Sequence, residues 1–199
     1  MRKIDAEWAK CLSSQQYRVL REGATEAPYS SLLAREAASG RYQCAGCGAV
    51  VFRSGDKFES RSGWPSFAAA AMLGGSDGSG GSGGGGGGHG REGSSAVRVE
   101  RSALEALTGA AVRCATCDGR LGERFLDGAR YPGTLAARTK QAFLVNGAAL
   151  VFVPADGSPA KSGDALLRTG RYGQQEGDVE SKFKSGGLWR MQDGGLRPI

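Results

Sequence analysis

The chain has 199 residues, of which 40% are hydrophobic and 34 are glycine, and its net charge is +6. This length suits one domain with appendages. Lysines and arginines are scattered along the sequence, which argues against the clustered basic stripe of a nucleic-acid-binding protein. No apolar segment approaches a membrane span, and the first residues lack the apolar core of a signal peptide. We therefore expect a protein of the cytoplasm, which is a reducing compartment.

The N-terminal residues 5–22 are predicted to be helical because apolar side chains such as Trp8 recur among polar ones. Ser13 to Gln16 has the form of a capping box, which predicts the start of a second helix. Cys11 lies in the first helix, and we interpret it as an inert cysteine.

Short strands are predicted for much of the remaining domain. The run 143–153 is the most apolar, and it predicts either a buried pair of strands or one bent strand. The other segments with strand character lie next to turn signals at 41–53, 57–67, 97–101 and 110–114. Many short strands separated by turn signals indicate a mainly β domain.

A glycine-rich insertion at 74–93 interrupts these strands, and its composition is typical of a flexible coil. Phosphate-binding patterns of the G-x-G-x-x-G type match it only trivially, because any run of glycine does. His89, the only histidine of the chain, lies in this run and is interpreted as an incidental loop residue. The insertion therefore carries no predicted site.

The composition shifts again after residue 153, so we predict a domain at 1–153 and a C-terminal extension at 154–199. Glycine, serine and charged residues dominate the extension, and a disordered tail is one interpretation. Trp189 and Met191 favour the other interpretation, an arm that wraps the domain or docks on a partner, because such side chains are enriched in interface cores.

Four of the five cysteines form two Cys-x-x-Cys pairs, Cys44 with Cys47 and Cys114 with Cys117. Each pair is followed by glycine or Asp-Gly, which suits the reversal of a zinc knuckle, and two knuckles make a tetrahedral four-thiolate site. Two disulfides or a redox-active pair are the alternatives. Because four protein ligands close the coordination sphere, such a zinc is structural rather than catalytic.

Several motifs occur in an order that resembles the type B methionine sulfoxide reductases, which reduce methionine-R-sulfoxide. The resemblance covers roughly residues 5–153, and its motifs are WAKCLSSQQYRVLREGATEAPY, YQCAGCG, KFESRSGWPSF, RCATCDGRLGERFLDG and VNGAALVF. It implies two antiparallel β-sheets flanked by short N-terminal helices. It also implies a structural zinc on the same four cysteines.

The reaction of that family needs a nucleophilic cysteine, which attacks the sulfoxide, and usually a second cysteine that resolves the product as a disulfide. By the resemblance, Leu144 occupies the nucleophile position and Ser62 the resolving position. Ala142 replaces the neighbouring arginine, and Arg120 and Glu123 replace two histidines. No catalytic residue is therefore assigned. The family residues that remain and that are expected to line a former substrate pocket are Trp64, Asn146, Phe125 and Asp127.

The predicted function is that of a pseudoenzyme, a zinc-stabilised binding or structural subunit of a larger protein assembly, cytoskeletal or other. It would dock through the former substrate face, the glycine-rich insertion or the C-terminal extension. The alternative is a working reductase that uses Cys11 or the thiol of a partner.

Overall fold

The computed structural model describes residues 5–73, 94–100, 109–164, 189–192 and 195–198. The glycine-rich insertion, with His89, lies outside the described residues. The chain divides into two compact units, Met1–Leu166 and Leu167–Ile199. No helix in the described part of the chain is both long enough and apolar enough to cross a bilayer.

A six-stranded antiparallel sheet forms one layer of the first unit, with strand order β3-β4-β8-β7-β6-β5. Its strands are β3 (Lys57–Phe58), β4 (Ser66–Phe67), β5 (Val97–Glu100), β6 (Ala110–Cys114), β7 (Arg120–Phe125) and β8 (Ala142–Val145).

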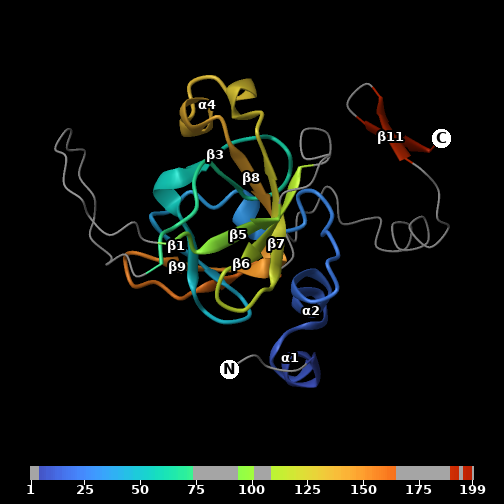
Figure 1. Cartoon of the computed structure of the whole chain (residues 1–199), viewed down its shortest axis with the longest axis vertical. Coiled ribbons are helices and arrows are strands. Elements are labelled where there is room, and N and C mark those ends of the chain that lie inside the picture. The colour runs from blue at the N-terminus through green and yellow to red at the C-terminus, as the bar shows by residue number, and fades with distance from the viewer. Residues whose placement is uncertain (1–4, 74–93, 101–108, 165–188, 193–194, 199) are drawn as a thin grey trace. The chain divides into compact units, whose positions relative to one another are not determined.

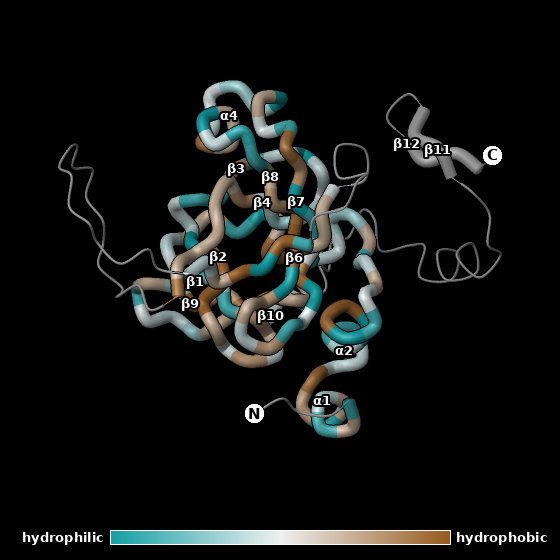
Figure 2. The backbone as a smooth tube through the Cα atoms, in the orientation of Figure 1, coloured by the Kyte–Doolittle hydropathy of each residue, from teal (hydrophilic) through white to brown (hydrophobic). Residues whose placement is uncertain are grey.

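A four-stranded antiparallel sheet forms the other layer, with order β10-β9-β1-β2. Its strands are β1 (Gly40–Cys44), β2 (Val50–Arg53), β9 (Leu150–Pro154) and β10 (Lys161–Ser162). These two sheets confirm the prediction of a mainly β fold built from two antiparallel sheets. Figure 2 shows that hydrophobic residues concentrate in the strands, β9 among them, while many of the connecting loops are hydrophilic.

The core lies where aromatic side chains of the two sheets meet. Phe67 of the six-stranded sheet stacks on Phe52, with ring centroids 4.4 Å apart, and meets the edge of Tyr42 at 4.8 Å. Phe52 and Tyr42 belong to the four-stranded sheet, and all three rings are fully buried. Burial of such large apolar surfaces is the main favourable term that joins the layers.

The apolar run 143–153 forms two strands that belong to different sheets. Strand β8 lies in the six-stranded sheet and β9 in the four-stranded one, and a 3-10 turn, η4 (Gly147–Ala149), joins them. The two strands therefore do not pair with each other, and the run crosses from one layer to the other. This crossing explains why most residues of the run are buried.

Two short helices, α1 (Asp5–Cys11) and α2 (Ser14–Leu20), precede the sheets. The predicted capping box is confirmed, because Ser13 Oγ accepts from Gln16 N–H at 3.2 Å and Gln16 Oε1 accepts from Ser13 N–H at 3.0 Å. A further short helix, α4 (Leu135–Thr139), lies at the other end of this unit (Figure 1).

Strand β10 extends the first unit beyond residue 153, where composition placed the domain boundary. Lys161 pairs with Phe152 of β9, and the carbonyl of Gly163 accepts a 2.7 Å hydrogen bond from buried Ser31. Within the second unit, β11 (Trp189–Gln192) and β12 (Gly195–Pro198) form an antiparallel hairpin.

Candidate functional site

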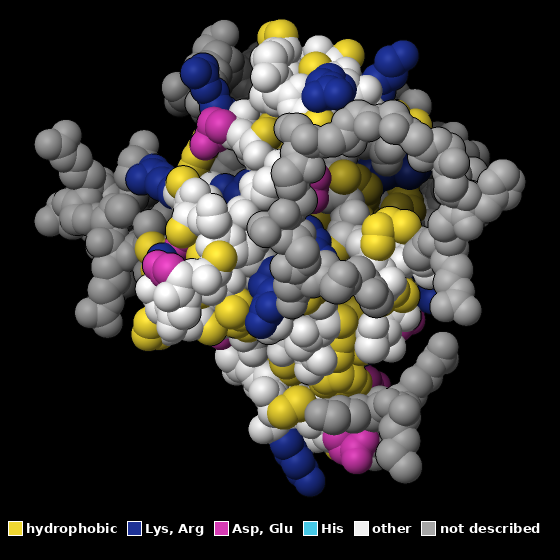
Figure 3. Space-filling model, turned by 90° about the vertical axis from the view of Figure 1, so that its left-hand side faces the viewer, with side chains coloured by type: hydrophobic (Ala, Val, Ile, Leu, Met, Phe, Trp, Pro, Cys, Tyr) yellow, Lys and Arg dark blue, Asp and Glu magenta, His cyan; other side chains and the backbone are white. Residues whose placement is uncertain are grey.

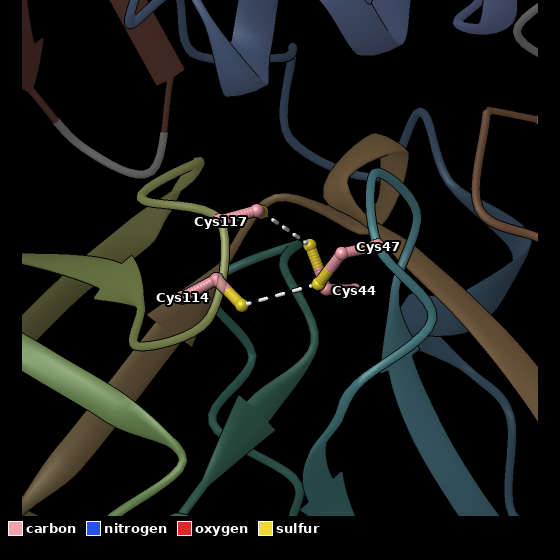
Figure 4. Close-up of side chains that lie close together, drawn as sticks. All are labelled: Cys44, Cys47, Cys114 and Cys117. Carbon is pink, nitrogen blue, oxygen red and sulfur yellow. Dashed lines mark hydrogen bonds between the residues drawn. The ribbon is translucent and has the colours of Figure 1, made fainter. Parts of the chain in front are cut away.

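The four paired cysteines converge at one point, although 67 and 73 residues separate the two contacting pairs. Their sulfur atoms all lie within 4.8 Å of one another, and Cys44–Cys117 and Cys47–Cys114 are each 3.6 Å apart (Figure 4). Tetrahedral coordination with zinc–sulfur bonds near 2.3 Å needs sulfurs about 3.8 Å apart. The geometry therefore fits one zinc ion, and none of the five described cysteines is in a disulfide.

Both knuckles use the same backbone turn. The N–H of Gly48 donates to the carbonyl of Cys44 at 2.8 Å, and that of Asp118 donates to Cys114 at 2.9 Å. Gly48 and Asp118 both have left-handed backbones, with φ of 74° and 63°. Glycine and aspartate tolerate this conformation better than most residues, which explains why they follow the cysteine pairs.

Four thiols packed this closely cannot ionise together without a cation. The hydrogen bond with Cys114 raises the pKa of Cys44, whereas the hydrogen bond with Cys117 lowers the pKa of Cys114. A divalent cation compensates the repulsion because each thiolate ligates it. Zinc is therefore the cofactor of this protein, held by Cys44, Cys47, Cys114 and Cys117.

The N-terminal helices cover the metal centre. Arg21 donates to the carbonyl of Cys117 at 3.1 Å, and its guanidinium lies 5.1 Å from the ring centre of Trp8. Trp8 is buried, and its ring lies 3.4 Å from the place that a Cβ on Gly46 would occupy. With four cysteine ligands and this cover, the site has no open position for a substrate.

A separate cavity of about 120 Å³ opens beside strands β7 and β8. The register pairs Leu144 with Glu123 on one side and with Ser66 on the other. Close approach of the strands requires glycine at position 122, because a Cβ there would lie 2.1 Å from the carbonyl oxygen of Leu144. The lining residues are Thr25, Trp64, Arg120, Gly122, Glu123, Phe125, Leu144 and Asn146.

An ion pair forms the polar part of this cavity. Arg120 Nη2 lies 3.0 Å from Glu123 Oε1, and their side chains are 24% and 38% exposed. The two residues are three apart on β7, where the bulged register with β6 leaves both within reach of the cavity.

Glu26 holds the cavity wall together, although no local pattern around it predicts this role. Its carboxylate accepts from the backbone N–H groups of Gly147 at 2.5 Å and Ala148 at 2.9 Å. Its own N–H donates to Asn146 Oδ1 at 2.9 Å, and its carbonyl accepts from the indole of Trp64 at 3.1 Å. Burial raises the pKa of Glu26, and the two backbone hydrogen bonds partly offset that rise.

Comparison with known proteins shows the family of this chain. A model of the SelR domain matches residues 12–74. A peptide methionine sulfoxide reductase MsrB from Leifsonia xyli is 36% identical over 154 residues, which is 77% of this chain and 91% of that protein. The Bradyrhizobium diazoefficiens MsrB is 37% identical over 152 residues, which is 76% of this chain and 89% of that protein. The chain belongs to the MsrB family.

The MsrB-family residues expected in the pocket are only partly gathered. Trp64, Asn146 and Phe125 line the cavity together with Leu144. Asp127 is not among the lining residues and instead forms an ion pair of 3.1 Å with Arg130.

Ser62, which the family resemblance aligns with the resolving cysteine, belongs to a hydroxyl cluster and is not among the cavity-lining residues. Ser62 Oγ lies 2.7 Å from Ser60 Oγ, which in turn lies 2.6 Å from Ser66 Oγ. Ser66 also donates to the carbonyl of Trp64 at 3.0 Å. These hydroxyls fix the turn that presents Trp64 to the cavity.

Proposed function

We propose that this MsrB-family protein binds one unbranched, methionine-like side chain of a partner protein without reducing it. The observation that carries the proposal is Leu144, a residue without redox chemistry, at the cavity position where the family resemblance places the nucleophile. Sulfoxide reduction by thiols requires a sulfur nucleophile that is oxidised in the reaction. No cysteine or histidine is present among the described residues that line the cavity.

The placement of the cysteines supports this proposal. Four of them ligate zinc, and ligation removes their thiolates from redox chemistry. Cys11 is exposed on α1, and its thiol donates to the backbone carbonyl of Glu7 at 3.4 Å. Activation of a thiol needs a neighbouring base or cation inside a shaped pocket, and α1 contributes no residue to the cavity lining.

The size of the cavity supports a single side chain as the ligand. Its volume of about 120 Å³ is well below the several hundred Å³ typical of cofactor and drug sites. Trp64, Phe125 and Leu144 supply apolar walls of the kind that suit an unbranched stem.

We also propose that protein partners are engaged through the C-terminal extension, as part of a larger assembly in the cytoplasm. A two-stranded hairpin such as β11–β12 is at best marginally stable alone in water, so a partner surface would stabilise it. On the face drawn in Figure 3, lysine and arginine side chains of the described residues stand apart from one another, which favours a protein partner over a nucleic acid.

The alternative function is peptide methionine-R-sulfoxide reduction with a non-standard thiol, either Cys11 or one from a partner. The names of the relatives favour it, since those proteins are called reductases and share about a third of their residues with this chain. One assay separates the two functions. Peptide methionine-R-sulfoxide is incubated with the zinc-loaded protein and dithiothreitol or thioredoxin, and the binding of the same peptide is measured by calorimetry. Binding without product supports our proposal, whereas product that disappears in Cys11→Ser supports the alternative.

A further inference from the structure

The polar groups of the cavity differ in how much hydrogen-bonding capacity they retain. The indole N–H of Trp64 is used by the carbonyl of Glu26. Asn146 accepts from the N–H of Glu26 and donates from Nδ2 to the carbonyl of Leu121 at 3.1 Å. The polar groups of Trp64 and Asn146 are already hydrogen-bonded within the protein. These two side chains therefore shape the cavity wall and are poor candidates for recognising the polar end of a ligand.

Arg120 and Glu123 retain hydrogen-bonding capacity for a ligand. In their mutual contact Nη2 donates to Oε1. Oε2 of Glu123 and the other N–H groups of Arg120 lie outside this contact and can bond to a ligand. The Nε atom of Arg120 is buried and has no hydrogen-bond partner among the described residues. The arginine stem runs beside Gly23, where a Cβ would lie 3.5 Å from Cδ. The cavity thus offers a donor and an acceptor side by side.

We propose that the cavity takes the carboxamide end of a glutamine side chain from the partner protein. This inference rests on the proposed function, namely that one unbranched side chain enters the cavity. A carboxamide carries a carbonyl oxygen that can accept from Arg120 and an NH₂ group that can donate to Glu123. Its planar group and methylene stem suit the aromatic and aliphatic walls made by Trp64, Phe125 and Leu144.

Other side chains of similar length cannot make a favourable hydrogen bond to both Arg120 and Glu123. A methionine thioether is only a weak acceptor, and a sulfoxide accepts from Arg120 but has nothing to donate to Glu123. A glutamate ligand is repelled by Glu123, and a lysine ligand by Arg120. Specificity is a difference between the affinities for two ligands. The carboxamide is therefore favoured because it bonds to both Arg120 and Glu123, and because each competitor bonds poorly to one of them.

A peptide panel tests the ligand class with the full-length, zinc-loaded protein. One flexible Gly/Ser host peptide carries glutamine, methionine, methionine-R-sulfoxide, norleucine or glutamate at a single position, and Kd is measured by calorimetry at neutral pH. We expect glutamine to bind about tenfold or more tightly than norleucine, since hydrogen bonds to charged groups are involved. Equal or tighter binding of norleucine, methionine or the sulfoxide would overturn the carboxamide inference alone. Absence of binding by all five peptides would contradict the proposed function as well.

Two variants of matched size test the residues. Arg120→Met and Glu123→Met should each reduce the preference for glutamine over norleucine by about tenfold, while the affinity for norleucine changes little. Arg113→Met is the control, because Arg113 forms a comparable 2.7 Å ion pair with Glu100 and does not line the cavity. The ratio of two affinities is insensitive to a uniform loss of folded protein. An unchanged ratio in both cavity variants, or the same change in Arg113→Met, would refute the inference.

Discussion

The carboxylate of Glu26 accepts a 2.5 Å hydrogen bond from the backbone N–H of Gly147, a residue 121 positions away in the chain. This contact joins the loop after α2 to the turn between β8 and β9, where the chain crosses from one sheet to the other. The side chain of Ser31 reaches the same turn, since a Cβ on Gly147 would lie 2.0 Å from its Oγ. The cavity beside Trp64 and Asn146 therefore depends on a buried polar anchor as well as on the sheets.

Replacement of Glu26 should destabilise the domain. In Glu26→Gln, the amide can accept from one backbone N–H but places its NH₂ group against the other, so a buried donor is left unpaired. We expect a loss of about 1–3 kcal/mol in the free energy of unfolding, measured by urea denaturation. Glu22→Gln, at an exposed position of the same loop, should change stability by less than about 0.5 kcal/mol. Equal effects of the two substitutions would show that Glu26 is not an anchor.

Removal of one zinc ligand should prevent folding of the domain. Binding of a structural zinc contributes on the order of 10 kcal/mol, which exceeds the stability of most domains. Cys114→Ser should yield insoluble or unfolded protein, and the wild type should contain one zinc per chain by metal analysis. Cys11→Ser, at the exposed cysteine, should retain both zinc and fold. Well-folded wild-type protein without zinc would contradict the assignment.

Restoration of a single cysteine should not restore turnover. Leu144→Cys places a thiol in the cavity, but Arg120 and Glu123 stand where the family resemblance places two histidines, and Ala142 stands in place of an arginine. Without neighbouring basic or cationic residues that lower its pKa and orient it, a thiol is a weak nucleophile. We expect little or no reduction of peptide methionine-R-sulfoxide with dithiothreitol in this variant and none in the wild type. Rapid turnover by Leu144→Cys would show that the surrounding residues still suffice.

Truncation should separate the domain from its proposed docking arm, and the position of the cut matters. A chain that ends at Leu166 keeps β10 and should melt close to the full-length protein while losing its partners. A chain that ends at Ala160 also loses Lys161 and Gly163, with their contacts to β9 and Ser31, and should melt several degrees lower. Full partner binding by the first truncation would move the docking surface to the cavity face.

The ion pair that fixes β10 should make stability depend on pH. Burial raises the pKa of Glu36, but hydrogen bonds from Lys161 and from the backbone outweigh it, so the pKa lies below its ordinary value of 4.5. The stabilisation is present above that value and is lost as the pH falls through the lowered pKa. Glu36→Gln should cost about 0.5–1 kcal/mol at neutral pH, and this cost should shrink as the pH falls below 4.5. If Glu36→Gln lowers the free energy of unfolding equally in acid, the effect comes from packing and not from the charge of Glu36.

Local sequence determined the metal site and the class of the fold. The cysteine spacing, with Gly48 and Asp118 after the pairs, specifies two identical turns, because a left-handed residue is needed after each pair. The capping box at Ser13 depends on side chains three residues apart, so it could also be predicted from the local sequence. That Leu144 itself cannot act as a nucleophile also follows from the sequence alone, because a leucine side chain has no nucleophilic atom in any fold.

Tertiary structure alone decided how the cavity is built. Strand β7 was not predicted, because Gly122 interrupts the alternation of apolar and polar residues. The reason for this glycine is the close approach of Leu144 on the neighbouring strand, which only the tertiary structure shows. Asp127 was expected in the pocket but forms an ion pair with Arg130, since the corner after β7 carries it away from the lining residues. Glu26 has no local signature, because its partners come from loops that only folding brings together. Hydrogen bonds between residues distant in sequence are set by packing, and no local pattern encodes them.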